Sequence, residues 1–156
     1  MATLKYQRSW SPRFKTAVLV VLIALSSQSS ITLAQAKEVR CNQSQQSLVK
    51  KHITKQITAL ANSDWQRAYS YSAKSFQSSI TVDQFKLIIE SGYLFLTENG
   101  NLTFGACKNS KNAFNQLLTV DSMGDKYELV YNLTLVGKRL GIVAVGGVKP
   151  PSEVAI

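Results

Sequence analysis

The sequence has few of the residues on which metal and nucleophile sites depend: two cysteines, Cys41 and Cys107, and one histidine, His52, in 156 residues. Neither cysteine belongs to a CxxC motif, so these residues are too few for a Cys/His metal site, and we expect no metal and no cofactor. The sequence also has no Gly-x-Ser-x-Gly motif and no phosphate-binding glycine loop. It therefore carries no standard signature of a serine hydrolase or a nucleotide-binding protein.

Acidic residues are scarce as well, with nine Asp and Glu against 18 Lys and Arg, for a formal net charge of +9. The basic residues are scattered, and their densest clusters are the pairs Lys50-Lys51 and Lys138-Arg139. Nucleic-acid-binding proteins usually concentrate Lys and Arg on one face, with aromatic residues between them. Because this pattern is missing, we expect no nucleic-acid partner.

Long apolar runs are also missing. The uninterrupted run over residues 17–25 is nine residues long, whereas a transmembrane helix needs roughly 20. This run follows a basic segment and precedes the triplet Ala34-Gln35-Ala36, which is the order of regions in a secretory signal peptide. We therefore predict a signal peptide over residues 1–36, with an uncleaved membrane anchor as the alternative. The protein would be exported, periplasmic or extracellular, with no stable membrane span after cleavage.

The remaining chain has the length of one domain. We expect a single domain over residues 37–149 and a loose tail over residues 150–156, which begins at Pro150-Pro151. An oxidising compartment allows Cys41 and Cys107 to pair. A disulfide between them is the favoured interpretation, and two buried free thiols are the alternative.

Two helices are predicted at the start of this domain. Apolar residues at spacings of three and four predict a helix over residues 43–61, with one apolar face formed by Leu48, Val49, Ile53, Ile57 and Leu60. Ser63 and Gln66 have the spacing of a capping box, which predicts a second helix running to about residue 72. One face of this helix is expected to pack in the core: Trp65, Ala68, Tyr69 and Ser72. Phe76 would pack beneath the loop that follows.

A third helix is predicted after a second capping box, formed by Thr81 and Gln84. This helix would end at Ser91-Gly92, where glycine can adopt the left-handed conformation of a C-terminal cap. The apolar run Tyr93-Leu94-Phe95-Leu96 follows and is expected to pack inward.

From about residue 101 the apolar residues alternate with period two, which predicts β-strands. A hairpin turn is expected at residues 122–125, and glycines at 141, 146 and 147 suggest bends or bulges in a curved sheet. The predicted fold class is α+β, with three N-terminal helices packed on a curved antiparallel sheet of four strands. The expected strands cover residues 101–108, 113–122, 126–136 and 140–148.

The segment from Ser63 to Tyr93 resembles the opening pattern of a family of uncharacterised bacterial exported domains, and the similarity extends over residues 45–149. The sequence departs from the family pattern at Leu94, where a proline often stands, and at Leu140-Gly141, where a tryptophan commonly opens the last strand. The resemblance implies the cone-shaped fold of nuclear transport factor 2-like proteins, a group that includes isomerases, dehydratases and non-enzymatic binding modules. The matching residues are Asp64, Ala68, Tyr69, Ser72, Thr81, Phe85, Gly92 and Tyr93.

Helices over a curved sheet tend to leave a hollow that can hold a small molecule. We expect an aromatic lining of this hollow, formed by Tyr69, Tyr93, Phe95 and Tyr131. The favoured function is non-catalytic binding of a small apolar ligand or of an envelope protein. The alternative is a small isomerase- or hydratase-like enzyme that uses a cavity carboxylate, such as Asp121 or Glu128, together with a tyrosine.

Overall fold

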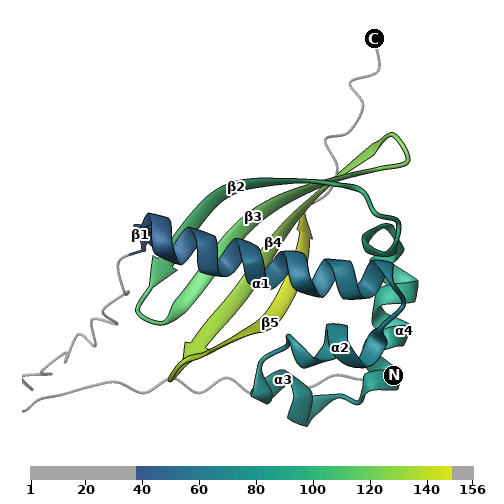
Figure 1. Ribbon diagram of the computed structural model, residues 1–156, viewed down its shortest axis with the longest axis horizontal. Helices are drawn as coiled ribbons and strands as arrows, with labels where there is room; N and C mark the ends of the chain where they lie inside the picture. Colours follow the sequence, from purple (N-terminus) through teal and green to yellow (C-terminus); the bar gives the residue numbers. More distant parts are fainter. Residues whose placement is uncertain (1–37, 149–156) are drawn as a thin grey trace, which may run out of the picture. The chain divides into compact units, whose positions relative to one another are not determined.

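The computed structural model of the protein describes residues 38–148, which form an α+β domain (Figure 1). The predicted signal peptide and C-terminal tail lie outside the described residues. Four α-helices and a short 3-10 helix precede the long strands, where three helices were expected. Their bounds are α1 Gln43–Ala61, α2 Trp65–Ser70, α3 Lys74–Ser79, α4 Val82–Gly92 and η1 Leu94–Thr97.

The sheet has five strands in the order β1-β2-β3-β4-β5, and every neighbouring pair is antiparallel. The prediction of four strands was wrong, because β1 has only two residues and shows no alternation to detect. The other four strands are those expected, with slightly different ends. The strand bounds are β1 Val39–Arg40, β2 Asn101–Ser110, β3 Ala113–Ser122, β4 Asp125–Val136 and β5 Arg139–Val148.

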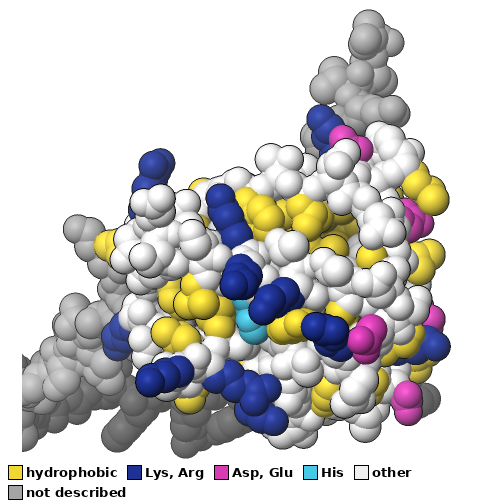
Figure 2. Space-filling model, in the orientation of Figure 1, with side chains coloured by type: hydrophobic (Ala, Val, Ile, Leu, Met, Phe, Trp, Pro, Cys, Tyr) yellow, Lys and Arg dark blue, Asp and Glu magenta, His cyan; other side chains and the backbone are white. Residues whose placement is uncertain are grey.

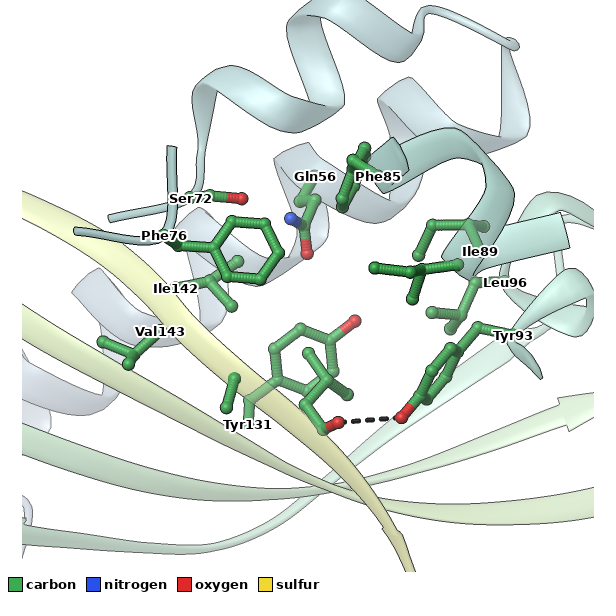
Figure 3. Close-up of a pocket in the computed structure, with 13 residues that line it drawn as sticks. Gln56, Ser72, Phe76, Phe85, Ile89, Tyr93, Leu96, Tyr131, Ile142 and Val143 are labelled. Carbon is green, nitrogen blue, oxygen red and sulfur yellow. Dashed lines mark hydrogen bonds between the residues drawn. The ribbon is translucent and has the colours of Figure 1, made fainter. Parts of the chain in front are cut away.

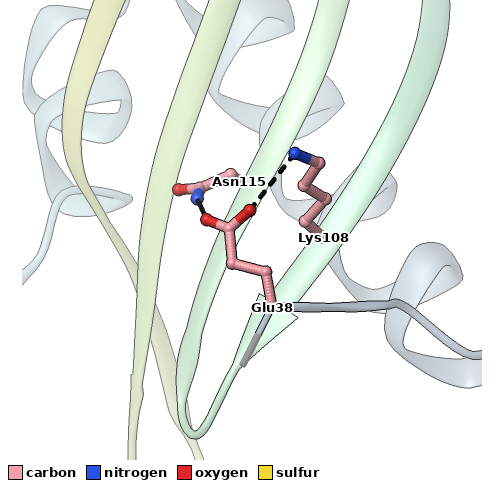
Figure 4. A network of polar contacts seen from close by, with 3 residues as sticks. All are labelled: Glu38, Lys108 and Asn115. Carbon is pink, nitrogen blue, oxygen red and sulfur yellow. Dashed lines mark hydrogen bonds and ion pairs between the residues drawn. The ribbon is translucent and has the colours of Figure 1, made fainter. Parts of the chain in front are cut away.

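Exposed polar contacts attach the short first strand to the rest of the sheet (Figure 4). The Glu38 carboxylate lies 3.2 Å from the Lys108 ammonium on β2 and accepts a hydrogen bond of 3.1 Å from the Asn115 side chain on β3. The Cys41 backbone N–H donates to the Cys107 carbonyl at 3.0 Å. These contacts hold the start of the domain against β2 without requiring a longer strand.

The helices gather on one side of the sheet. Figure 1 shows α1 lying across one face of the curved strands, with α2 and α3 on the β5 side. Buried side chains from α1 pack against side chains from the centre of the sheet. Every second residue of β3 and β4 points to this face of the sheet and is buried there. This core includes Val49, Ile53, Leu60, Leu118, Val120, Leu129 and Leu133.

Helix α1 follows its predicted bounds and begins with a capping box formed by Asn42 and Gln45. Its buried face includes Val49, Ile53, Ile57 and Leu60, as expected, but Leu48 is 45% exposed. The prediction for Leu48 was wrong because the buried face of α1 is narrower than assumed. This face also includes Gln56, a polar residue that is buried between Ile53 and Leu60.

Helix α2 is shorter than predicted and has a different cap. Asp64, not Ser63, is the N-cap, and its carboxylate accepts a hydrogen bond from the Arg67 backbone N–H at 3.0 Å. Ser63 instead belongs to the end of α1, where its φ is 55° and its N–H bonds to the Leu60 carbonyl. Because Ser63 closes one helix, it cannot cap the next.

Helix α4 ends at Gly92, as predicted, but the predicted left-handed cap at Gly92 was wrong: Gly92 has no positive φ, and the C-cap is Tyr93, whose N–H bonds to the Ile89 carbonyl. Phe76, which was expected to pack beneath a loop, lies on the short helix α3, which was not predicted. The apolar run after α4 becomes the 3-10 helix, in which Leu96 is buried and Leu94 is exposed.

The bulge in β5 lies near Gly141 and not at any of the three expected glycines. In the β4–β5 ladder, Asn132 pairs with Ala144 and Leu133 with Ile142, so Val143 is the extra residue. Gly146 and Gly147 stay in register. The hairpin turn at residues 122–125 is confirmed, with Met123 and Gly124 both at positive φ.

Candidate ligand cavity

A cavity of about 200 Å³ lies between α4 and the sheet (Figure 3). Residues from α1, α3, α4, η1, β4 and β5 contribute to its wall, together with one residue from the α2–α3 junction. Most of these side chains are apolar. The lining residues are Gln56, Ser72, Phe76, Phe85, Ile88, Ile89, Tyr93, Leu96, Tyr131, Ile142, Val143, Ala144 and Val145.

The apolar wall follows from helical spacing on α4. Phe85 and Ile89 are one turn apart and both are buried, so they face the sheet together. The Phe85 ring packs edge-on against Phe76, with the ring centroids 6.2 Å apart. Ile88 and Val143 also line the cavity but are 43% and 39% exposed, so the cavity reaches the surface between α4 and β5.

Tyr131 places a buried hydroxyl at the wall of this apolar space. It lies at the centre of β4, its side chain is 0% exposed, and its ring rises from the sheet into the cavity (Figure 3). No residue among 38–148 forms a hydrogen bond with this hydroxyl. Burial raises the pKa of Tyr131 well above its ordinary value, and the neighbouring Tyr93 hydroxyl adds to the shift. The group is therefore a neutral hydrogen-bond donor.

Tyr93 lies beside Tyr131 but has its own partner. It is the C-cap residue of α4, and its hydroxyl donates a hydrogen bond of 2.8 Å to the Val145 carbonyl on β5 (Figure 3). This bond fixes the tyrosine at the cavity wall and ties the end of α4 to the edge strand. Two of the four predicted lining residues, Tyr93 and Tyr131, thus lie side by side in one cavity.

The structure places the other two predicted lining residues outside the cavity wall. The Tyr69 hydroxyl lies 2.6 Å from the Ile80 carbonyl and 2.8 Å from that of Gln77, so it anchors the loop after α3. Phe95 stacks on Tyr127, with the ring centroids 3.9 Å apart and the planes at 4°. The rings of Tyr69 and Phe95 are therefore partly buried and pack at the edge of the core.

Two polar lining residues were not among the sequence-based candidates. Gln56 is buried on α1; its amide nitrogen donates to the Ala68 carbonyl at 3.4 Å, and its amide oxygen points into the cavity (Figure 3). Ser72 is buried between α2 and α3. A signal for Gln56 was available, because it stands three residues after Ile53 and four before Leu60, on the buried face of its helix.

The two carboxylates considered for an enzyme lie elsewhere. Asp121 pairs with Lys126 next to the β3–β4 turn, and Glu128 alternates with the buried Leu129 on β4, so it points to the opposite face of the sheet. Neither residue is part of the cavity lining. Within residues 38–148 the lining contains no charged side chain.

His52 lies apart from the cavity. It is half-buried on α1, and its Nε2 is 2.8 Å from the Tyr71 carbonyl. Figure 2 shows Lys and Arg side chains gathered around it on this face of the domain. Burial lowers the pKa of His52 and the charges of Lys55 and Arg139 lower it further, while the hydrogen bond to Tyr71 acts in the opposite direction.

Cys41 and Cys107 form a disulfide, with their Cα atoms 5.4 Å apart. The part of the chain that the structure describes holds no group of three or more His, Cys, Asp or Glu residues suited to a metal ion. None of the helices within residues 38–148 combines the length and apolar character that a membrane crossing requires.

Comparisons with known proteins give the family without a function. Neither the search of curated proteins nor the search of solved structures found a match. The sequence model of one family, described as "Domain of unknown function (DUF4864)", matches residues 42–152. The match includes all the residues that line the cavity and Cys107, and it begins one residue after Cys41. Because this match covers well over half of the chain, the protein belongs to the DUF4864 family.

Proposed function

We propose that this domain is an exported, non-catalytic binding module that holds a small, mainly apolar molecule in the cavity between α4 and the sheet. The observation that carries the proposal is an apolar cavity with a buried Tyr131 hydroxyl that has no hydrogen-bond partner among residues 38–148. Ligand sites in proteins typically combine apolar walls with a few placed polar groups.

The cavity volume sets the size of the ligand. Drug-sized molecules occupy pockets of roughly 300–1,000 Å³, whereas a buried apolar cavity of about 150 Å³ accepts benzene. At about 200 Å³, the present cavity suits a single ring or a short aliphatic chain. One apolar side chain from a partner protein has a similar size, so an envelope protein that inserts such a side chain is the other occupant to test.

A route into the cavity supports the proposal. Ile88 on α4 and Val143 on β5 are both lining residues and both exposed. Val143 is also the bulged residue of the β4–β5 ladder, and a bulge redirects a side chain relative to the regular strand. A small molecule can therefore enter between α4 and β5 without separating the helices from the sheet.

Export and the cone-type fold are parts of the same proposal. The Cys41–Cys107 disulfide is compatible with an oxidising compartment such as the bacterial periplasm. The helices packed on one side of a bent sheet are compatible with the nuclear transport factor 2-like arrangement. Mass spectrometry of the protein purified from the periplasm or medium tests export, with a mature chain that begins after Ala36 as the expected result.

The isomerase- or hydratase-like alternative stays a hypothesis. It needs a carboxylate next to a tyrosine hydroxyl in the cavity, and the carboxylates of Asp121 and Glu128 lie outside the lining residues. The observations on the cavity favour binding.

Toluene is a suitable probe for this cavity, with binding followed by protein NMR chemical shifts. Ile89→Trp adds volume to the wall and should abolish toluene binding, whereas Leu87→Trp, on the exposed side of the same helix, should leave it unchanged. Should Ile89→Trp fail to fold, Ala144→Phe offers a second obstruction at an exposed lining position. Equal binding by the Ile89 and Leu87 variants would contradict the proposal.

A further inference from the structure

The polar groups that line the cavity indicate the chemical class of the ligand, whereas the cavity volume indicates only the size of the ligand. Tyr131 presents a neutral donor, since burial keeps its hydroxyl protonated and no residue among 38–148 accepts its hydrogen bond. The Gln56 amide oxygen presents an acceptor from the opposite wall, because the amide nitrogen is directed to the Ala68 carbonyl. The two groups point into the same space from α1 and from β4 (Figure 3).

A ligand that uses both groups must accept one hydrogen bond and donate another. An alcohol or phenol hydroxyl does both with a single oxygen atom. A carboxylate cannot donate, and the lining offers no positive charge to compensate for the burial of its negative charge. A pure hydrocarbon would fill the volume but leave the Tyr131 hydroxyl without a hydrogen-bond partner.

We infer that the cavity selects a small, uncharged hydroxyl compound, whose hydroxyl accepts a hydrogen bond from Tyr131 and donates one to Gln56, and whose apolar part lies against Phe85 and Ile89. This inference rests on the proposed function, because it names the class of ligand for the same cavity. Tyr93 takes no part in recognising the hydroxyl, since its own proton is directed to the Val145 carbonyl.

Three probes of similar size separate the contributions of the apolar ring, the hydroxyl group and a negative charge to binding: toluene, benzyl alcohol and benzoate. Their dissociation constants are measured by NMR titration with the disulfide-bonded protein expressed from the full chain. Tyr131→Phe removes the donor and keeps the ring. It should weaken benzyl alcohol binding about five- to tenfold, which is the effect of one ordinary hydrogen bond. Toluene binding should be unchanged or tighter, and benzoate should bind more weakly than benzyl alcohol to the wild-type protein.

Tyr69→Phe is the matched control, because it removes a tyrosine hydroxyl that lies outside the cavity wall and already has protein partners. It should leave the ratio of the toluene and benzyl alcohol dissociation constants unchanged. If Tyr131→Phe also leaves this ratio unchanged, or if benzoate binds best, the inference about the hydroxyl is overturned while ligand binding stands. If no probe binds to the wild-type protein, the proposed function fails and the inference fails with it.

Discussion

Buried amide side chains of this domain lie where regular hydrogen bonding is interrupted. Gln116 is 0% exposed on β3, and its amide nitrogen lies 3.1 Å and 3.4 Å from the carbonyls of Gly105 and Ala106. Those two residues form the bulge of β2, where the register with β3 shifts. A bulge leaves backbone groups without ladder partners, and the glutamine supplies a donor to them. Gln56 adds a second donor at the end of α2, because the Ala68 carbonyl accepts hydrogen bonds from both its amide nitrogen and the Tyr71 backbone N–H.

At the scale of a single residue, His52 gives a prediction about how the stability of the domain depends on pH. Its pKa in the folded protein is lowered, first by burial, so the unfolded chain binds a proton more readily than the folded one below the ordinary value of 6.5. The contribution of neutral His52 to stability is therefore complete above pH 6.5 and decreases as the pH falls below it. Chemical denaturation at pH 7.5 and 5 should show a smaller loss of stability in His52→Gln than in the wild-type protein. Identical losses in the two proteins would contradict this assignment.

At the scale of elements, the segment between α2 and α3 protects the edge of β5. The Ala73 N–H donates to the Ile142 carbonyl at 2.7 Å, and the Ile142 N–H donates to the Tyr71 carbonyl at 3.0 Å. Ser72 and Ile142 form an isolated parallel bridge. The contact covers part of an edge strand, which otherwise offers unpaired backbone groups to other chains. It also brings Ser72 to the cavity wall.

This contact requires a glycine on β5. A Cβ atom at Gly141 would lie 2.5 Å from the Ala73 Cα and 2.8 Å from its backbone nitrogen, and backbone atoms cannot move aside cheaply. Gly141→Ala should therefore lower the free energy of unfolding by about 1–3 kcal/mol, measured by urea denaturation. Gly146→Ala is the control on the same strand, because nothing lies within 4 Å of its Cβ position. Its effect should stay within about 0.5 kcal/mol, and equal effects at the two positions would disprove the packing argument.

At the scale of the whole domain, the disulfide joins distant parts of the chain. Cys41 precedes α1 and Cys107 lies on β2, at a sequence separation of 66, so the bond encloses all of the helices within residues 38–148. Both cysteines are buried in the same core as the central strands. Together with the pairing of β1 and β2, the bond attaches the start of the domain to the sheet.

A cross-link over this separation should stabilise the domain by about 4 kcal/mol, chiefly by restricting the unfolded chain. The double variant Cys41→Ser/Cys107→Ser should therefore unfold at a clearly lower urea concentration than the oxidised wild-type protein. Added reductant should lower the midpoint of the wild-type protein in the same way and leave the double variant unaffected. A wild-type midpoint that does not respond to complete reduction would refute the prediction.

Much of the fold could be predicted because its signals are local. The apolar spacing of residues 43–61 and the capping box at Thr81 place α1 and α4 within a residue or two of their observed ends. The alternation over β3 and β4 gives the buried face of the sheet correctly. One error occurs where a residue had two possible local roles. Ser63 has the pattern of an N-cap but serves the end of the preceding helix.

The cavity was less predictable than the elements that surround it. The sequence made four aromatic residues equal candidates for the lining: Tyr69, Tyr93, Phe95 and Tyr131. Of these, Tyr93 and Tyr131 line the cavity between α4 and the sheet. The spacing of Gln56 from Ile53 and Leu60 indicates the buried face of α1, but no sequence signal shows that its amide reaches a cavity. Whether its amide faces a core, a backbone carbonyl or a cavity depends on residues far away in the chain.

The sequence alone thus determined the α+β class, the buried faces of the main helix and strands, and the two cysteines available for pairing, because these follow from periodicity and composition. Only the tertiary structure decided that Tyr131, Gln56 and Ser72 share one cavity, that β1 completes the sheet and that Gly141 lies against Ala73. A cavity is the volume left between packed elements. Its position depends on how the six elements that line it meet in space, and no local pattern along the chain encodes that arrangement.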